Sequence, residues 1–367
     1  MTLRDVHIPN RVWLAPMCQY SCLQRDGMPT DWHLVHLGAR ATGGFGLVMT
    51  EAAAVSPEGR ISPEDAGIWN DEQARAWARI AAFVAGQGAV PAMQLAHAGR
   101  KGSTYSFWHA GRGTVPADEG GWTTVGPSPI PFEGYLAPES LDGGAIAQVT
   151  ADFAAAAARA DRAGFEVVEI HAAHGYLLHQ FLSPLSNART DAYGGSLANR
   201  ARLLVEVVTA VREVWPERKA LFVRFSGTDW VTGGWTVEET AQVARWVADL
   251  GVDLVDLSSG GNAIAQIPVG PGYQVPLATQ VKEQSGVPTA AVGLITEPVQ
   301  AAHILAEGQA DAVLLARAAL REPSWPQRAA HVLGVSRSNI PYPPQYVRGA
   351  RPEPAPVAAQ APAERSA

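Results

Sequence analysis

The sequence predicts a single (β/α)8 barrel, the TIM-barrel class of α/β fold, with a long capping loop after its third strand. Eight short apolar runs each precede an amphipathic segment, and these pairs occupy roughly 330 residues, a length that this class accommodates. The runs are apolar on both faces, as expected for a parallel sheet covered by helices. The first run leads into Pro16-Met17-Cys18 without the Gly-rich turn of an open dinucleotide-binding sheet, so a closed barrel is favoured.

Each predicted element follows from its local pattern. The predicted strands span residues 12–16, 46–52, 90–96, 165–170, 220–226, 253–258, 288–293 and 311–316. The predicted helices span about 31–43, 71–87, 143–163, 198–215, 237–250, 273–285, 297–307 and 323–333. Asp31, Asn70 and Thr236 are predicted N-caps, because short polar side chains accept hydrogen bonds from free N–H groups at a helix start. Glycines such as Gly88 and Gly164 end several helices as left-handed C-caps.

One domain is expected, with residues 1–350 forming the barrel. The connection at about 97–142 joins the third strand to its helix and is rich in Gly, Pro and aromatic residues. A loop this long is usually functional, and on a barrel it would cap the mouth of the active site. Residues 351–367 are rich in Pro and Ala without periodicity, so they are predicted to form a disordered C-terminal tail.

Composition limits the possible partners. The net charge of −7 provides no basic surface for nucleic acid or for an anionic membrane. No apolar run is long enough to span a membrane, and the N-terminus has no apolar signal core. Two cysteines, Cys18 and Cys22, are too few for a disulfide framework, which favours a reducing, cytoplasmic setting.

The carboxyl ends of the predicted strands carry hydrogen-bonding groups and few carboxylates. They offer no acid pair for glycosidic chemistry and no lysine placed to form a Schiff base, so they suit a polar, planar, anionic cofactor that supplies the chemistry itself. The last two strands end at Gly293 and Arg317, and barrels often bind phosphate there. The alternative is that Arg317 pairs with Glu322 or Asp311.

Two histidines follow the fourth predicted strand, and their spacing leaves two chemical roles open. His171 and His174 reach one point only if the chain turns after Ile170, which Gly175 makes plausible. Two imidazole N–H donors could then bind one carbonyl oxygen. Metal ligation is the rival role, but no third ligand or cysteine cluster lies nearby in the sequence, so no metal is expected.

Several long motifs resemble the Old Yellow Enzyme family, in particular its thermophilic-like branch of FMN-dependent ene-reductases. The motifs are PMCQYS (16–21), TEAAAVSPEGR (50–60), MQLAHAGRK (93–101), IHAAHGYLLHQFLSPLSNARTDAYGGS (170–196), VRFS (223–226), PGYQVPLA (271–278), AVGLI (291–295) and PPQYVRG (343–349). The resemblance covers roughly residues 1 to 350. It implies an FMN-bearing barrel that takes hydride from NADPH or NADH and reduces activated C=C bonds by a ping-pong mechanism.

The resemblance implies catalytic roles for four residues and a substrate-binding role for a fifth. His171 and His174 would bind the substrate oxygen, and Tyr176 would donate a proton to the α-carbon. Cys18 would lie against the O4/N5 edge of the flavin, and Tyr20 would contact the substrate. For each residue the alternative is a packing role. Cys22 matches no family role and is expected to pack.

The resemblance also implies a set of cofactor-binding residues. Gln94 and Arg224 would read the pyrimidine edge of the flavin, and no acidic residue neighbours Arg224 in VRFS. Ala52 would leave room for the ring. The set is completed by Pro16, Met17, Gly293 and Arg317.

The C-terminal PPQYVRG motif implies an oligomer. In this branch its arginine, here Arg348, enters the substrate site of the neighbouring subunit, so a homodimer or homotetramer is expected. The branch often has an aromatic residue after RG, whereas Ala350 stands here, which puts this contact in doubt.

Two alternative functions fit the sequence less well. Related flavin barrels with an iron–sulfur centre need a downstream cysteine cluster, and no cysteine follows Cys22. A flavin-free barrel lyase or isomerase acting on a phosphorylated substrate would explain Arg317, but not Gln94, Arg224 and Cys18.

Overall fold

Eight parallel strands close into a barrel in the computed structural model, which describes residues 1–353. The strands are β3 (Val12–Leu14), β4 (Leu47–Ala54), β5 (Val90–Ala96), β8 (Val167–Ala172), β9 (Ala220–Ser226), β10 (Leu254–Ser258), β11 (Thr289–Ala291) and β12 (Ala312–Leu315). Neighbours in this order pair with each other, and β12 pairs with β3 to close the circle. The predicted (β/α)8 barrel is therefore confirmed.

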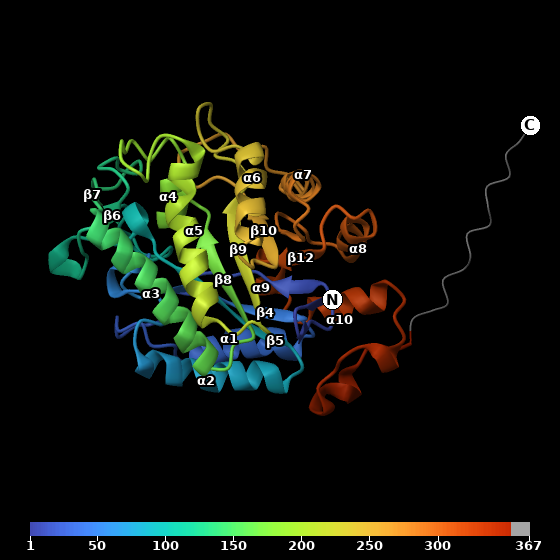
Figure 1. Cartoon of the computed structure of the whole chain (residues 1–367). Coiled ribbons are helices and arrows are strands. Elements are labelled where there is room, and N and C mark those ends of the chain that lie inside the picture. Colours follow the sequence, from blue (N-terminus) through green and yellow to red (C-terminus); the bar gives the residue numbers. More distant parts are fainter. Residues whose placement is uncertain (354–367) are drawn as a thin grey trace, which may run out of the picture.

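Helices surround the strands (Figure 1). They are α1 (Asp31–Thr42), α2 (Asp71–Gly86), α3 (Gly143–Arg162), α4 (Leu177–Leu182), α5 (Leu197–Val214), α6 (Val237–Ala248), α7 (Val275–Ser285), α8 (Pro298–Ala306), α9 (Arg317–Arg321) and α10 (Trp325–Val332). The short helices α4 and α9 were not predicted, because neither is long enough to show a helical period. No helix among residues 1–353 is long and apolar enough to cross a membrane.

The predicted helix caps are mostly confirmed. Asn70 and Thr236 accept from the backbone N–H groups of Gln73 and Glu239, as N-caps do. Asp31 is not a cap: Thr30 is the N-cap of α1, and Asp31 begins the first turn. An acidic residue there still interacts favourably with the helix dipole.

An N-terminal hairpin closes the bottom of the barrel. Its strands β1 (Thr2–Leu3) and β2 (Val6–His7) pair antiparallel. Leu3 and the fully buried Ile8 join an apolar cluster inside the barrel, where Trp13 stacks on Phe222 with ring centroids 5.7 Å apart. This layer fills the amino-terminal half of the barrel and leaves the carboxyl ends of the strands for polar groups.

The long segment 97–142 contains short elements only. These are η2 (Gly99–Lys101), η3 (Ala117–Glu119) and the strands β6 (Val125–Gly126) and β7 (Glu139–Ser140). The buried Arg100 ties the segment together by donating to Ile130 O and Asn262 O. Lys101 donates to His174 O and Gly261 O, so the segment contacts the loops that follow β8 and β10.

Candidate active site

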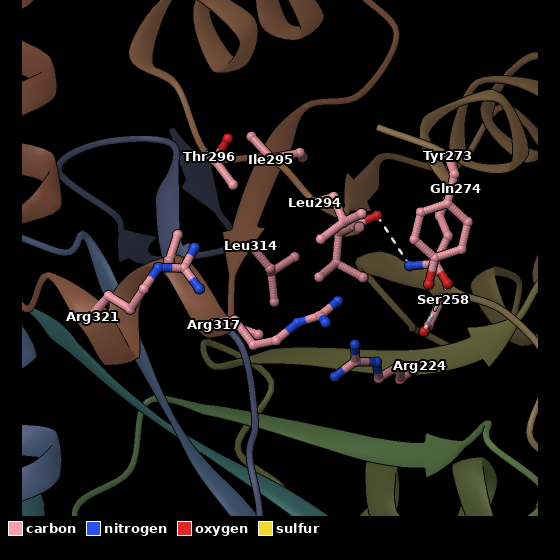
Figure 2. A pocket seen from close by; sticks show the side chains of 14 residues that line it. Arg224, Ser258, Tyr273, Gln274, Leu294, Ile295, Thr296, Leu314, Arg317 and Arg321 are labelled. Carbon is pink, nitrogen blue, oxygen red and sulfur yellow. Dashed lines mark hydrogen bonds between the residues drawn. The ribbon is translucent and has the colours of Figure 1, made fainter. Parts of the chain in front are cut away.

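A pocket of about 170 Å³ opens between the carboxyl ends of β9 to β12 (Figure 2). Its lining residues are Arg224, Ser258, Tyr273, Gln274, Val292, Gly293, Leu294, Ile295, Thr296, Leu314, Ala316, Arg317, Ala318 and Arg321. The side chains of Arg317 and Arg224 point into the same space in Figure 2. The predicted phosphate residues Gly293 and Arg317 are therefore brought together with Arg224.

The acidic residues considered as partners for Arg317 are engaged elsewhere. Asp311 lies 2.9 Å from Lys282, and Glu322 lies 2.8 Å from Arg328. Within residues 1–353, Arg317 forms no ion pair, which leaves its charge available to an anion in the pocket.

Arg321 is a further cation of this pocket that the sequence reading missed. It lies one turn after Arg317 on α9, and residues four apart share a helix face. The signal was present in the spacing of the two arginines, but it required α9 to be recognised as a helix.

Gly293 shapes the pocket through its backbone. Its φ of +124° is one that L-residues rarely adopt, and an added Cβ would lie 2.9 Å from the Gln274 amide. Gln274 is itself fixed, because its amide donates to Val292 O and accepts from Ser259 Oγ. A glycine therefore allows a ligand to approach the backbone closely at the end of β11.

A layer of buried polar residues crosses the barrel beside this pocket. Gln94 pairs in register with Ala52 on one side and with Glu169 on the other. The Gln94 amide donates to Glu169 Oε1 over 2.7 Å. Arg224 Nε lies 3.1 Å from Asp256 Oδ2, an ion pair whose atoms are not aligned for a hydrogen bond.

Glu169 and Asp256 were not predicted, because their partners lie on neighbouring strands and do not follow from the residues of one strand alone. VRFS contains no acidic residue, but Asp256 pairs with Arg224 in register on the neighbouring strand. Both carboxyl groups are at most 1% exposed. The available signal was the second acidic residue in each of the apolar runs FEVVEI and DLVDLS.

Burial raises the pKa of both carboxyl groups. The pKa of Glu169 rises to about 8 through burial and the negative charge of Asp256, against the opposing effect of Arg224. The pKa of Asp256 rises to about 6 through burial, again opposed by Arg224. One guanidinium thus faces two carboxyl groups, so this layer is neutral when the two share one proton.

The two histidines meet at the end of β8, because the chain turns as expected. His174 has a φ of +58° and Gly175 one of +72°, which together reverse the direction of the backbone. The imidazole centroids lie 5.1 Å apart with their planes at 90°. Burial, followed by the charge of Arg224, lowers the pKa of each ring well below 6.5, so both are neutral at physiological pH.

Neighbouring groups determine which nitrogen of each ring can donate. The backbone N–H of Ala173 donates to His171 Nδ1 over 3.2 Å, so a neutral His171 carries its proton on Nε2. His174 Nε2 lies 2.7 Å from Ser258 Oγ. The Ser258 hydroxyl has one proton, which it can donate either to this nitrogen or to Gln274 Oε1, 3.3 Å away. In the first case Nδ1 of His174 carries the proton and becomes the free donor.

Tyr176 completes the cluster. Its ring centroid lies 5.1 Å from that of His171 and 5.1 Å from Lys101 Nζ. Burial raises the pKa of the phenol well above 10, which keeps it protonated and able to donate.

The loop after β3 brings the remaining predicted residues to the same end of the barrel. Cys18 packs with Tyr176 against an apolar group that includes Ala52 and Ala96. Burial, with the charges of Asp65 and Glu51, raises the pKa of Cys18 well above 9, so it remains a thiol. Pro16 and Met17 connect β3 to this position, while Cys22 is a buried free cysteine.

A buried contact between Glu51 and His33 supports this loop. Glu51 Oε2 accepts from the backbone N–H of Gln19, and Glu51 Oε1 lies 2.8 Å from His33 Nε2. Both side chains are almost fully buried. They attach the 16–20 loop to β4 and α1, and the sequence reading did not identify either residue.

A second cavity of about 450 Å³ lies outside this cluster. Tyr20 and Tyr176 line it together with residues of the 97–142 segment, among them Tyr105 and Tyr135. Tyr20 also contacts Trp108 edge to face, with centroids 5.4 Å apart. An aromatic-lined space thus leads away from the two histidines.

Arg348 is not brought to the site within this chain. It is exposed in η5 (Pro344–Gly349), and neighbouring residues of that segment line a groove with Thr42, Gly43 and Pro323. Thr42 and Gly43 are at the end of α1, which runs back toward the amino-terminal side of the barrel.

The site can therefore hold an anionic group beside the arginines and a flat polar ring above the Gln94 layer. Across residues 1–353, no three His, Cys, Asp or Glu side chains are grouped as metal ligands. The chemistry of the residues fits a phosphorylated ring cofactor such as FMN: free cations for phosphate, a glycine cradle, and a Gln and an Arg for the ring.

Known proteins resemble the chain over nearly its whole length. The sequence profile of the NADH:flavin oxidoreductase / NADH oxidase family matches residues 1–335. An NADPH dehydrogenase of Geobacillus thermodenitrificans is 45% identical over 351 residues, which cover 95% of this chain and 97% of that protein.

Two solved structures share the fold. The Old Yellow Enzyme homologue from Zymomonas mobilis aligns with a TM-score of 0.76 and 26% identity, covering 96% of this chain and 98% of the other. A 2-naphthoyl-CoA reductase aligns with a TM-score of 0.83 and 25% identity, covering 90% of this chain but 51% of that one. The chain thus corresponds to about half of that reductase and to all but a few per cent of the Zymomonas mobilis protein.

Proposed function

Because the chain belongs to the NADH:flavin oxidoreductase / NADH oxidase family, the Old Yellow Enzyme family, and is thus an FMN-dependent oxidoreductase using NAD(P)H, we propose that it reduces activated alkenes. The proposed substrates are α,β-unsaturated ketones and aldehydes, maleimides and nitroalkenes. The observation that carries the proposal is the cluster of two neutral imidazoles and a phenol beside Gln94 and Arg224. A flavin-free lyase or isomerase is not favoured, since it would leave this cofactor layer without a use.

Bound FMN would supply a hydride that comes from NAD(P)H, and the proposed cycle is ping-pong. His171 Nε2–H and His174 Nδ1–H would donate to the carbonyl or nitro oxygen of the alkene. Such donors stabilise the negative charge that develops on oxygen, each by roughly 2.7–4 kcal/mol. Neutral imidazoles suit this role because they need no proton from solvent before the substrate binds.

Tyr176 is the proposed proton donor. The hydride adds two electrons and a hydrogen to the β-carbon, and the phenol proton completes the reduction at the α-carbon. The phenolate is then reprotonated by water. The high pKa of Tyr176 means that it keeps its proton until this charge develops.

Different residues are proposed to bind the pyrimidine edge, the phosphate and the ring of FMN. Gln94 and Arg224 would bind the pyrimidine edge, where Arg224 opposes the negative charge of the reduced ring. Gly293, Arg317 and Arg321 would bind the phosphate. Pro16, Met17, Cys18 and Ala52 would contact the ring beside the apolar cluster that contains Cys18 and Ala52.

The 97–142 segment and Arg348 are proposed to complete the substrate site. The aromatic cavity containing Tyr20 supports a capping role for the segment, with Tyr20 contacting the substrate. Arg348 would act in the neighbouring subunit of a homodimer or homotetramer, as the PPQYVRG motif suggests.

Absorbance tests the proposal. The purified protein should be yellow, bleach anaerobically with NADPH or NADH, and recolour when an enone is added. Double-reciprocal plots at several enone concentrations should be parallel. A colourless protein that does not take up added FMN would refute the proposal.

A phenol titration tests the histidine pair directly. The variant His171→Ala/His174→Ala should lose most of the charge-transfer absorbance that a bound phenolate gives with oxidised flavin. His303→Ala, an exposed histidine on α8, is the control and should behave as wild type. Unchanged phenol affinity in the double variant would rule out the oxygen-binding role.

A further inference from the structure

Glu169 is a buried carboxyl group that the proposed reaction does not use. It lies on β8 two residues before His171, so both side chains point into the barrel. Its exposed fraction is 0%. A carboxyl group in such a place destabilises the fold unless its contacts compensate.

Gln94 is the group to which Glu169 is hydrogen bonded. The contact runs from Gln94 Nε2 to Glu169 Oε1 over 2.7 Å, while Glu169 Oε2 has no partner among the described residues. Arg224 is oriented instead toward Asp256, 3.1 Å away. Glu169 is therefore placed to hold an amide rather than to neutralise the cation of this layer.

This contact fixes the orientation of the Gln94 amide. The Gln94 amide directs its NH2 end to Glu169 Oε1, which accepts in either protonation state, because a carboxyl group that carries its proton on Oε2 keeps Oε1 as an acceptor. The other end, Gln94 Oε1, receives no hydrogen bond from residues 1–353, yet it is not one of the buried atoms that lack a partner. The amide oxygen must therefore border open space and be free to accept a hydrogen bond from a ligand.

We propose that Glu169 is a positioning residue for FMN: it turns Gln94 so that the amide oxygen accepts from the N3–H group of the flavin. The pyrimidine edge of FMN has this one N–H between two carbonyl oxygens. An amide with a fixed acceptor recognises that N–H, whereas a freely turning amide recognises the edge less well. The proposal rests on FMN binding and on the assignment of Gln94, and it is independent of the substrate.

The holoenzyme reconstituted with FMN carrying 15N at N3 provides the first test, which needs no variant. The N3–H signal in the proton–nitrogen NMR spectrum should move downfield from its position in free FMN and should exchange slowly with water. A signal at the free position would overturn the proposal.

Glu169→Gln provides the second test. A glutamine can donate or accept, so Gln94 is no longer held in one orientation, and the N3–H signal should shift back toward free FMN or exchange faster. Glu283→Gln is the control, because it makes the same chemical change at an exposed position of α7; its N3–H signal should stay at the wild-type position. An unchanged signal in Glu169→Gln, or an equal change in both variants, would count against a specific role of Glu169.

A double-mutant cycle separates positioning from a general structural effect. If Glu169 acts through Gln94, Glu169→Gln should weaken FMN binding several-fold in the wild-type background. In a Gln94→Leu background the same change should have little effect. Equal weakening in both backgrounds would show that Glu169 acts independently of Gln94. Because the cycle measures FMN affinity alone, its failure would not count against the proposed reduction of alkenes.

Discussion

The backbone N–H of Ala173 determines which nitrogen of His171 carries the proton. It donates to Nδ1, and burial keeps the ring neutral, so the free donor is Nε2–H. The neighbouring ring of His174 depends on a rotatable hydroxyl, Ser258, rather than on fixed backbone. The position of the proton is therefore fixed by the backbone in His171 but depends on a hydroxyl group in His174, although the sequence shows the two histidines as an equivalent pair.

Tyr176→Phe should slow one half of the catalytic cycle only. Removing the phenol proton should lower the rate of enone reduction by at least ~10-fold, since proton donors contribute about 10² to 10⁴ and water can partly substitute. Flavin reduction by NADPH needs no proton from Tyr176 and should keep its wild-type rate. Anaerobic stopped-flow absorbance measures the two half-reactions separately. Equal slowing of both would show that Tyr176 supports the fold of the site instead.

Glu169→Gln should change how stability depends on pH. Burial raises the pKa of Glu169 from 4.5 to about 8, so the folded protein retains a proton that the unfolded chain has already lost. The free energy of unfolding therefore falls as pH rises from about 4.5 to about 8. The glutamine variant lacks this effect. The difference between its unfolding temperature and that of wild type should therefore increase in favour of the variant as pH rises across that range.

Thermal release of FMN, followed by its fluorescence in the holoenzyme, measures these unfolding temperatures. The buried histidines titrate in both proteins and cancel in the comparison. If the unfolding temperatures of the two proteins changed in parallel from about pH 5 to 8, the raised pKa of Glu169 would be contradicted. This is roughly the range in which the folded and unfolded states differ in protonation.

At the scale of elements, the turn between β8 and α4 places the proposed catalytic cluster. Gly175 packs against the loop after β10, where an added Cβ would lie 2.3 Å from Gly261 O. Lys101 fastens the two loops by donating to His174 O and Gly261 O. The buried helix α4 supports them, since Gln180 donates to Gly175 O over 2.7 Å.

Gly175→Ala should disrupt both stability and substrate binding. The new methyl group would collide with Gly261 and would also strain a residue whose φ is +72°. Gly88→Ala is the matched control: its φ is +84°, but no atom lies within 4 Å of the added Cβ. The control should lose about 1–2 kcal/mol of stability from backbone strain alone and keep wild-type phenol affinity.

Thermal unfolding and phenol titration of the two glycine variants give the comparison. Gly175→Ala should unfold at a lower temperature than Gly88→Ala and bind phenol more weakly than wild type. Equal losses in stability with unchanged phenol affinity would show that the close contact between the two loops does not position His174.

At the scale of the whole molecule, the repeating strand–helix pattern predicted the barrel. The eight strands and eight longer helices were predicted from apolar runs and caps, because both are local properties of the chain. Partnerships between strands were not predictable in the same way. Arg224 and Asp256 are 3.1 Å apart only because β9 and β10 pair in that register, which no single run reveals.

The candidate site was predicted through strand ends and family motifs. Gly293, Arg317 and Arg224 line one pocket, and Cys18 packs with Tyr176. Glu169 lies outside these motifs, and Glu51 lies within TEAAAVSPEGR (50–60) without a role that the motif assigns to it. The predicted tail at 351–367 falls almost entirely outside the described residues.

Subunit complementation tests whether Arg348 acts in a neighbouring chain. His171→Ala/His174→Ala and Arg348→Ala should each have low activity alone. When the two are co-expressed, a mixed dimer has one complete site, so activity should recover to roughly a quarter of wild type. No recovery in mixed oligomers whose presence is verified by mass spectrometry would mean that Arg348 does not act in trans.

Barrel closure by β3 and β12 also determines when this protein can fold during synthesis. Strand Val12–Leu14 can complete its pairing only after Ala312–Leu315 has been synthesised, because these two strands pair where the barrel closes. Until the ribosome has made nearly the whole chain, the growing sheet keeps two unpaired edges, which are prone to pair with other chains. Contacts between such distant segments also form slowly. A nascent chain that stalls before β12 should therefore depend on chaperones, and a truncation there should yield aggregates rather than a smaller enzyme.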